Sequence, residues 1–374
     1  MQADDLLPLW QDLVRDAAAR GEHIRIHGGN SKAPWMPAVQ RSGAETAEHT
    51  LDTTQFSGIT HYEPTELVLT ARAGTPLAEI EAALAAHQQF LPFEPPHFAR
   101  SGTSTATVGG MVACGLSGPA RMSAGAVRDY VLGASLLNGR GEVLHFGGEV
   151  MKNVAGFDVS RLLCGSLGSL GVILSVSLKV QPLPAAQATL RFAMTQDEAI
   201  TRCNTWAAQP LPVNASAWLP DRNTGKGVLT LRLRGAQAAV QAACARLGGE
   251  RLADAEAAAF WQALREQTLP WFASTWPGDS QAALWRLSLP GTAPMLDLSG
   301  TQLVEWYGAQ RWLISAAPAP IIQEAARQAG GHATRFRGGD SAAEVFCTLP
   351  APLDRIARNV KAAFDPHGVF PTLF

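Results

Sequence analysis

The sequence has no excess of charge of either sign. Across its 374 residues, Lys and Arg number 30 and Asp and Glu number 32, so the formal net charge is -2. A protein that binds nucleic acid or an anionic membrane surface needs surplus cations to replace the counterions of the phosphates. We therefore expect neither of these partners.

Cysteine is scarce and scattered. The five Cys residues stand at positions 114, 164, 203, 244 and 347, and no pair has the close spacing of a zinc or iron–sulfur site. The odd count also argues against a disulfide framework. We expect no metal site in this chain.

Long apolar runs are also missing. No stretch of about 18 apolar residues is present, so we expect no membrane-spanning helix. The first residues, MQADD, are acidic and lack the basic region of a signal peptide. With 47% hydrophobic residues the chain can build sizeable cores, and we expect a soluble cytoplasmic protein.

The chain divides into two parts of different composition. Glycine is concentrated between residues 101 and 171, whereas most of the ten Trp residues follow residue 200. The segment 181–186, QPLPAA, carries two Pro residues that break regular structure. The composition predicts domains over 1–182 and 183–374.

Periodicity predicts an α+β fold. Short strands and helices alternate in the first part. The second part reads β-α-β-β-α-β from Leu190 to Arg251, which is the split βαβ, or ferredoxin-like, pattern. A looser second copy follows over 284–337, and a helix over 353–364 ends the chain.

Three glycine-rich segments indicate close approach of a ligand to the backbone. HGGNS (27–31) follows a strand, and such a glycine pair lets amides approach an anion. Thr107 is placed to cap a helix that begins VGGMVACG (108–115). CGSLGSLGVI (164–173) leads into another strand. Each segment alone is also compatible with an ordinary tight turn or close packing.

Together these segments resemble the FAD-binding domain of the vanillyl-alcohol oxidase/p-cresol methylhydroxylase (PCMH-type) superfamily. Within it, the chain is most similar to the FAD-binding E subunits of bacterial glycolate oxidase. The resemblance covers residues 20–182 and extends over nearly the whole chain. It is carried by IRIHGGNSK (24–32), LDT (51–53), YEPTELVLTARAGTPLAEIEAAL (62–84), LPFEPP (91–96), VGGMVACGLSGP (108–119), VRDYVLG (127–133), FGGEVMKNVAGFDVSRLLCGSLGSLGVI (146–173), EWYGAQRWL (305–313) and FDPHGVF (364–370).

The resemblance implies a two-lobed PCMH-type FAD-binding domain followed by the ferredoxin-like domain. It implies contacts to FAD in four groups. The pyrophosphate would lie on Gly28, Gly29, Asn30 and Ser31, and the pyrophosphate and flavin side on Val108, Gly109, Gly110, Ala113 and Gly115. The adenine end would meet Gly171, Val172 and Ile173, and the isoalloxazine would border Pro95 and Pro96.

This chain departs from the family in the first loop and in the third segment. Many relatives carry a His that bonds covalently to the flavin where Asn30 stands, so the resemblance implies non-covalent FAD. Leu167 and Ser169 replace a Glu and a Thr of the family's glycine turn, which removes a polar contact.

The second part offers no recognisable catalytic centre. Oxidation of a 2-hydroxy acid needs a base near the hydroxyl and a cation for the carboxylate. The catalytic subunits that the resemblance implies end in a segment HAGDGNLH, which holds a metal or the substrate. This chain has no such segment. The nearest segment, GGHATRFR (330–337), makes His332, Arg335 and Arg337 candidates, and a solvated turn with one strand face is the more ordinary interpretation.

Three functions remain open from the sequence. The first is a FAD-binding subunit of a glycolate or D-lactate dehydrogenase complex, with a catalytic FAD subunit and an iron–sulfur subunit as partners, cytoplasmic or peripheral at the inner membrane. The second is a self-sufficient FAD-dependent 2-hydroxy acid oxidoreductase, and the third is a scaffold with a vestigial flavin site. For the first, Trp306, Tyr307, Arg311 and Trp312 form the predicted subunit interface, because aromatic residues and Arg are enriched at interface cores.

Overall fold

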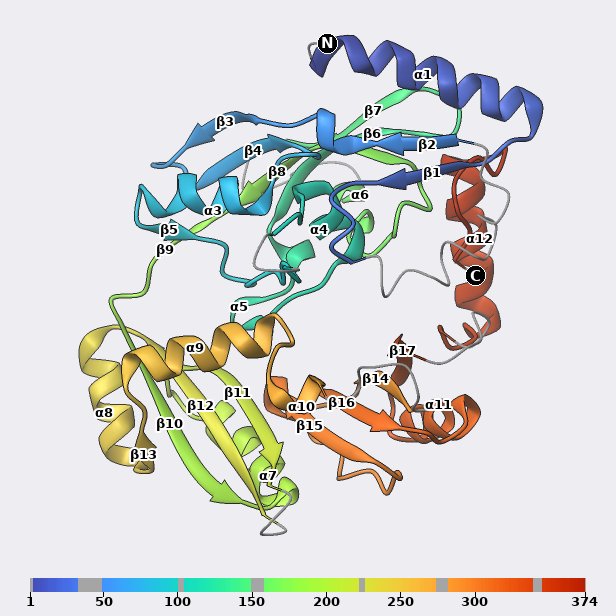
Figure 1. Cartoon of the computed structure of the whole chain (residues 1–374). Helices are drawn as coiled ribbons and strands as arrows, with labels where there is room; N and C mark the ends of the chain where they lie inside the picture. Colours follow the sequence, from blue (N-terminus) through green and yellow to red (C-terminus); the bar gives the residue numbers. More distant parts are fainter. Residues whose placement is uncertain are drawn as a thin grey trace. The chain divides into compact units, whose positions relative to one another are not determined.

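The computed structural model describes residues 3–32, 49–99, 104–148, 158–221, 226–273, 282–338 and 345–373. The chain forms two compact units (Figure 1). Unit 1 comprises Met1–Ser117, Gly125–Pro182 and Thr348–Phe374, and unit 2 comprises Gly118–Ala124 and Leu183–Cys347.

Unit 1 is built on an antiparallel sheet with strand order β3-β4-β8-β6-β7. A separate parallel pair, β1 and β2, and a short antiparallel pair, β5 and β9, complete its strands. Its helices and strands are α1 (Ala3–Arg20), β1 (Ile24–His27), β2 (His49–Asp52), β3 (Ile59–Glu63), β4 (Val68–Arg72), α3 (Leu77–Ala85), β5 (Gln89–Phe90), α4 (Val108–Cys114), β6 (Val131–Leu137), β7 (Val143–Gly147), α6 (Val159–Leu162), β8 (Val172–Lys179), β9 (Gln181–Pro182) and α12 (Ala351–Phe364).

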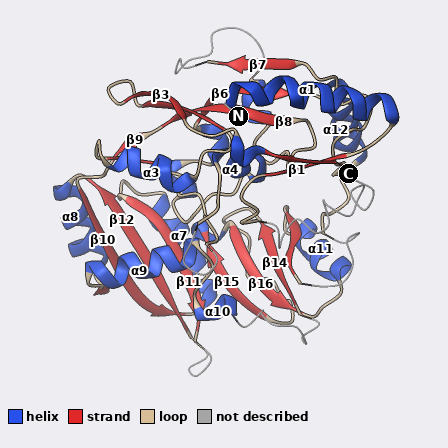
Figure 2. Cartoon of the chain, turned by 45° about the horizontal axis from the view of Figure 1, so that its top comes forward, coloured by secondary structure: helices blue, strands red, loops and turns tan. Residues whose placement is uncertain are grey.

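Strand β8 lies between two hydrophobic cores. Val172 and Leu174 pack with α1, whose residues Leu6, Trp10 and Val14 are spaced to share one helical face. Ile173, Val176 and Leu178 belong to the core that α3 and α4 cover. Burying each such side chain stabilises the fold by about 1.5–3 kcal/mol, so the sheet is fixed from both sides. Figure 2 shows α1 running along the strands of this unit.

The C-terminal segment belongs to unit 1 rather than to the second part of the sequence. Asp365, which is 2% exposed, accepts the amides of Val369 and Phe370 at 2.9 and 2.8 Å and pairs with Lys361 at 2.5 Å. Gly139 donates its amide to Phe364. The chain thus enters unit 2 briefly at Gly118–Ala124, enters it again after Pro182 and returns to unit 1 at Thr348.

Unit 2 holds one eight-stranded sheet in the order β13-β10-β12-β11-β15-β16-β14-β17. Its elements are α5 (Arg121–Ala124), β10 (Ala186–Met194), α7 (Gln196–Ala207), β11 (Val213–Pro220), β12 (Gly227–Gly235), α8 (Gln237–Leu247), β13 (Glu250–Arg251), α9 (Asp254–Arg265), α10 (Pro270–Ala273), β14 (Ala283–Ser288), β15 (Thr301–Glu305), β16 (Gln310–Ser315), α11 (Ala319–Gln328) and β17 (His332–Arg337).

The two predicted split βαβ copies are both present. The order β13-β10-β12-β11 and the order β15-β16-β14-β17 are the two ferredoxin-like arrangements, joined edge to edge where β11 pairs with β15. The second copy is reduced, because the described residues 289–300 between β14 and β15 form no helix. The α+β fold with a ferredoxin-like second part is therefore confirmed.

The two faces of this sheet differ in character. Helices α7, α8 and α11 cover the apolar face, where Ile200, Val240 and Ile322 enter its cores. Helix α9 packs on the opposite face, since Trp261 donates its Nε1–H to Thr189 Oγ1 at 3.0 Å. That opposite face also carries polar side chains, among them Thr230 and Arg232 of β12.

Candidate functional site

The loop after β1 presents its backbone to a pocket in unit 1. A Cβ at Gly29 would overlap the carbonyl oxygen of Thr105, so only glycine fits there. Asn30 adopts a left-handed conformation with φ +52°. Among the described residues, no backbone carbonyl accepts a hydrogen bond from the amides of Gly29, Asn30 or Ser31. These amides are therefore placed to bind an anion.

Helix α4 supplies the second wall of the pocket. Thr107 caps it as predicted, accepting the amide of Gly110 at 3.3 Å. The amides of Val108 and Gly109 donate to Thr75 and Ala73 at 2.9 and 2.7 Å. The first amides of α4 are thus satisfied within unit 1, and the helix offers a surface without side chains rather than free donors.

The third segment is fastened to α4 and forms another wall. The amides of Gly165 and Leu167 donate to the carbonyls of Val112 and Ala113 at 3.0 and 2.9 Å. Leu167 and Gly168 both have positive φ, +52° and +81°. A Cβ at Gly171 would overlap the carbonyl oxygen of Leu137, which explains the glycine at this bend.

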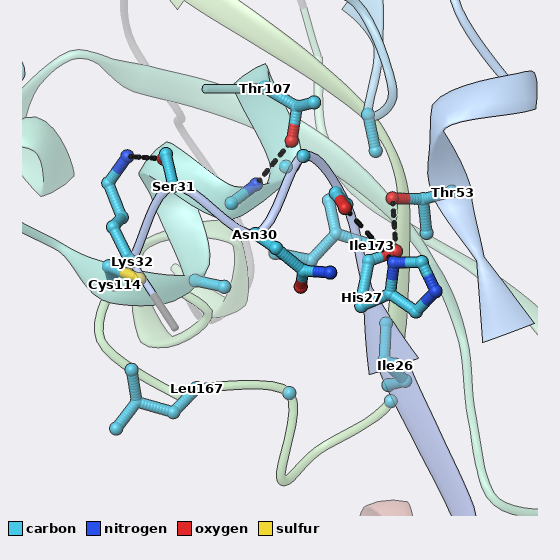
Figure 3. A pocket seen from close by; sticks show the side chains of 18 residues that line it. Ile26, His27, Asn30, Ser31, Lys32, Thr53, Thr107, Cys114, Leu167 and Ile173 are labelled. Atoms are coloured by element: carbon cyan, nitrogen blue, oxygen red, sulfur yellow. Dashed lines mark hydrogen bonds between the residues drawn. The ribbon is translucent and has the colours of Figure 1, made fainter. Parts of the chain in front are cut away.

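Figure 3 shows that the three segments meet around one pocket. Far-separated parts of the sequence converge here because β1, α4 and the turn before β8 are neighbours. The lining comprises Ile26, His27, Gly28, Gly29, Asn30, Ser31, Lys32, Thr53, Ala73, Thr107, Gly109, Gly110, Ala113, Cys114, Leu167, Gly168, Gly171 and Ile173.

Nine of the fourteen predicted FAD contacts are among these lining residues, and five are not. Val108 and Val172 are fully buried in the cores, and Gly115 ends α4 in the left-handed conformation. Pro95 and Pro96 are buried outside the lining. The pocket is therefore lined by the loop after β1, by α4 and by the turn before β8, and the two prolines do not contribute to its lining.

Lys32 brings a cation to the pocket, which the sequence did not assign to any role. Its side chain lies in the lining, its residue is 6% exposed, and Nζ donates to Ser31 Oγ at 3.1 Å. The ammonium also lies 5.8 Å from the ring centre of Phe98. A buried lysine next to open amides favours an anionic ligand. Lys32 is the last residue of the motif IRIHGGNSK (24–32), but its burial depends on packing against α4, which the motif does not predict.

The pocket also contains two potential nucleophiles, His27 and Cys114. His27 Nδ1 lies 3.0 Å from the carbonyl oxygen of Gly28 and 3.8 Å from Asp52. Burial raises the pKa of the Cys114 thiol, and the charge of Lys32 opposes that rise. At neutral pH Cys114 is therefore a thiol, the weakly nucleophilic form.

The three candidate catalytic residues of the second part do not form one site. In β17, His332 pairs with Ser288, whereas Arg335 pairs with Trp285, and these two positions of β14 point to opposite faces. A register shift precedes Arg337, which donates to Gln267 Oε1. Arg335 lies on the face that α11 covers, so the strand pleat separates it from His332.

The Trp-rich hairpin is core, so the predicted subunit interface is wrong. Trp306, Tyr307, Arg311 and Trp312 are 3, 7, 0 and 5% exposed within the described residues. Arg311 donates to the carbonyls of Gly308, Pro294 and Ala293, all in unit 2. These residues have no free surface for a partner. The sequence alone could not show whether the hairpin is core or subunit interface, because Trp and Arg occur in both protein interiors and interfaces.

The described residues hold neither a long apolar helix nor a cluster of metal-ligating side chains. None of the helices there is long and apolar enough to cross a membrane. In the same part of the chain, no group of three or more His, Cys, Asp or Glu side chains is arranged to hold a metal ion.

Comparison with known proteins defines the class of the first unit. Residues 10–147 match a family model described as FAD binding domain. The fold is similar to that of alkyldihydroxyacetonephosphate synthase, with a TM-score of 0.66 at 14% identity, covering 96% of this chain and 74% of that one. The chain is thus a flavoprotein with a PCMH-type FAD-binding fold, and FAD is its cofactor.

Sequence comparison then identifies the family. The chain is 48% identical to glycolate oxidase subunit GlcE of Escherichia coli (strain K12) over 357 residues, which are 96% of this chain and 93% of that relative. A D-lactate dehydrogenase of Archaeoglobus fulgidus is 36% identical over 110 residues, 29% of this chain and 24% of the relative. This chain belongs to the GlcE family of glycolate oxidase subunits.

Proposed function

We propose that the chain is the FAD-binding subunit of a multi-subunit dehydrogenase for glycolate or D-lactate. In this proposal the complex oxidises glycolate to glyoxylate, and the electrons pass on through partner subunits. The pocket of unit 1 carries the proposal, because it combines open amides, bare glycine surface and a buried cation. The relation to a glycolate oxidase subunit supplies the substrate and the expectation of other subunits.

Each feature of the pocket fits a part of FAD. The amides of Gly28–Ser31 would receive the pyrophosphate, and Lys32 adds a positive charge next to them. Gly109, Gly110 and Ala113 let a flat ring system approach α4 without side-chain interference. Gly171 and Ile173 would line the adenine end. When bound, FAD would supply a redox centre that can accept electrons and pass them on to partner subunits.

Attachment of FAD is proposed to be non-covalent. Asn30 lines the pocket at the position of the attaching His of relatives, and an amide is no nucleophile. Cys114 is held as a thiol by burial, and His27 Nδ1 is close to its own backbone. None of the three is therefore set up to bond to the flavin.

The proposed partners are a catalytic FAD subunit and an iron–sulfur subunit. The wide sequence separation of the five Cys residues supports placing the cluster on another chain. The proposed location is the cytoplasm, with attachment at the inner membrane through the complex. The absence of a net positive charge supports attachment through partners rather than by direct contact with lipid.

Anaerobic mixing with glycolate tests the proposal. The purified chain should be yellow and should keep its oxidised spectrum, whereas the complex with its sibling subunits should be reduced. Reduction of the flavin in the isolated chain would favour a self-sufficient oxidoreductase instead. A colourless chain that still assembles an active complex would favour a scaffold with a vestigial site.

A further inference from the structure

A cationic cluster surrounds Trp306 on the polar face of the sheet in unit 2. The guanidinium of Arg121 lies 4.6 Å from the centre of the Trp306 ring, and that of Arg286 lies 5.3 Å from it. Arg121 comes from α5 and Arg286 from β14. Two like charges that share one aromatic ring form a local excess of positive potential.

The cluster is held in place by directed hydrogen bonds. Trp306 donates its Nε1–H to the carbonyl of Gly118 at 3.1 Å, which fixes the ring and the start of the α5 segment. Ser123 donates to the carbonyl of Asn214 at 2.7 Å and so ties α5 to β11. Arg286 donates through Nε to Gln310 Oε1 at 2.7 Å. The two guanidiniums are therefore preorganised rather than freely moving.

The carboxylate of Glu305 acts on Arg286 and also accepts hydrogen bonds from two neighbouring side chains. Glu305, 4% exposed, accepts Trp312 Nε1 at 2.6 Å and Gln310 Nε2 at 3.0 Å. Burial and the charge of Arg121 lower the pKa of Arg286 to about 10, and Glu305 opposes this shift. The charge of Arg121 thus acts against that of Arg286, and an anion bound between the two guanidiniums would favour both charges.

His332 lies beside the cluster on the same sheet face. It pairs with Ser288, two residues from Arg286 on β14, and Arg286 pairs with Thr334. His332 is exposed. Neighbouring side chains desolvate part of the ring, and this desolvation, together with the charge of Arg286, lowers the pKa of His332. The imidazole is therefore neutral at pH 7 and keeps a lone pair that can accept a hydrogen bond.

We propose that Arg121 and Arg286 bind the carboxylate of a small 2-hydroxy acid, with His332 placed for its hydroxyl group. This inference rests on the proposed function, which supplies the 2-hydroxy acid. It replaces the trio of His332, Arg335 and Arg337, because the pleat places Arg286, not Arg335, on the face of His332. The shape requirement is a carboxylate and a hydroxyl on neighbouring carbons, which glycolate and D-lactate share.

Anaerobic equilibrium dialysis of radiolabelled glycolate against the full-length chain with FAD tests this site. We expect saturable binding that weakens about tenfold or more in Arg121→Ala and in Arg286→Lys, since each loses charge-assisted hydrogen bonds of defined geometry. Arg327→Ala is the matched control: Arg327 is an exposed arginine of unit 2, paired with Glu324, and its loss should leave binding unchanged.

Three results would overturn the assignment. They are no saturable glycolate binding by the wild-type chain, unchanged binding in both cluster variants, and equal displacement of glycolate by acetate or phosphate. Normal FAD content in the variants shows that unit 1 is folded, and an unchanged urea unfolding transition followed by Trp fluorescence shows that unit 2, which holds most of the Trp residues, is folded as well. If the complex oxidises glycolate while the variants bind it normally, the assignment of this binding site is refuted and the proposed function stands. If the complex does not oxidise glycolate, the proposed function fails on its own.

Discussion

Gly110 gives the sharpest test of where FAD binds. It lies in the first turn of α4 and lines the pocket. A Cβ placed there would lie 3.2 Å from Thr107 Oγ1, its nearest neighbour apart from the adjacent residues and the backbone of the helix itself. Its backbone is helical, so a side chain there adds no strain from a positive φ. Gly110→Val should therefore leave the fold intact while its methyl groups occupy space needed by the cofactor.

The size of the effect follows from overpacking. Extra methyl groups in a well-packed site cost about 1–3 kcal/mol, which raises the dissociation constant of FAD about 5- to 160-fold. Titration of the flavin-depleted chain with FAD, followed by flavin fluorescence, measures this constant. Gly110→Ala adds a single carbon and should fall between Gly110→Val and the wild type.

Ala82→Val is the matched control for this titration. Ala82 is exposed on α3 of the same unit and is not part of the pocket lining. The Ala82→Val chain should therefore bind FAD with the same affinity as the wild type. A Gly110→Val chain that binds FAD with the wild-type constant would refute the placement of the cofactor against α4.

Three further predictions concern stability and reactivity. Arg311→Ala should lower the free energy of unfolding by at least about 3 kcal/mol in urea titrations, because buried carbonyls lose their donor, and should leave subunit assembly of the folded fraction unchanged. Asp365→Ala should cost about 3–5 kcal/mol in the same assay, since the buried amides of Val369 and Phe370 lose their acceptor and the half-buried Lys361 loses its partner; a loss under 1 kcal/mol would contradict this. Burial raises the pKa of Cys164 and of Cys203 to about 12. At pH 8 only about one thiol in ten thousand is then ionised, so mass spectrometry after brief iodoacetamide treatment should find both unmodified in the folded chain.

Local signals in the sequence predicted most elements that form the pocket. The strand before Gly28 and the capping Thr107 are features of neighbouring residues, and the structure shows both. The split βαβ order of the second part followed from the alternation of strand and helix patterns. These signals act over a few residues, so a single sequence is enough to identify them.

Features that depend on distant contacts could not be predicted in this way. Lys32 is buried because it packs near Cys114 of α4, and Arg121 joins the sheet of unit 2 although most of its sequence neighbours belong to unit 1. The separation of His332 from Arg335 requires the pairing of β17 with β14. Composition and spacing carry no information on these pairings.

The most direct test of the central claim is a count of flavin in the purified wild-type chain after acid precipitation. The account predicts close to one FAD per chain in the supernatant, because the open amides and Lys32 hold the cofactor without a covalent bond. A chain that purifies without flavin and binds none on addition, or flavin that stays with the precipitated protein, would contradict it.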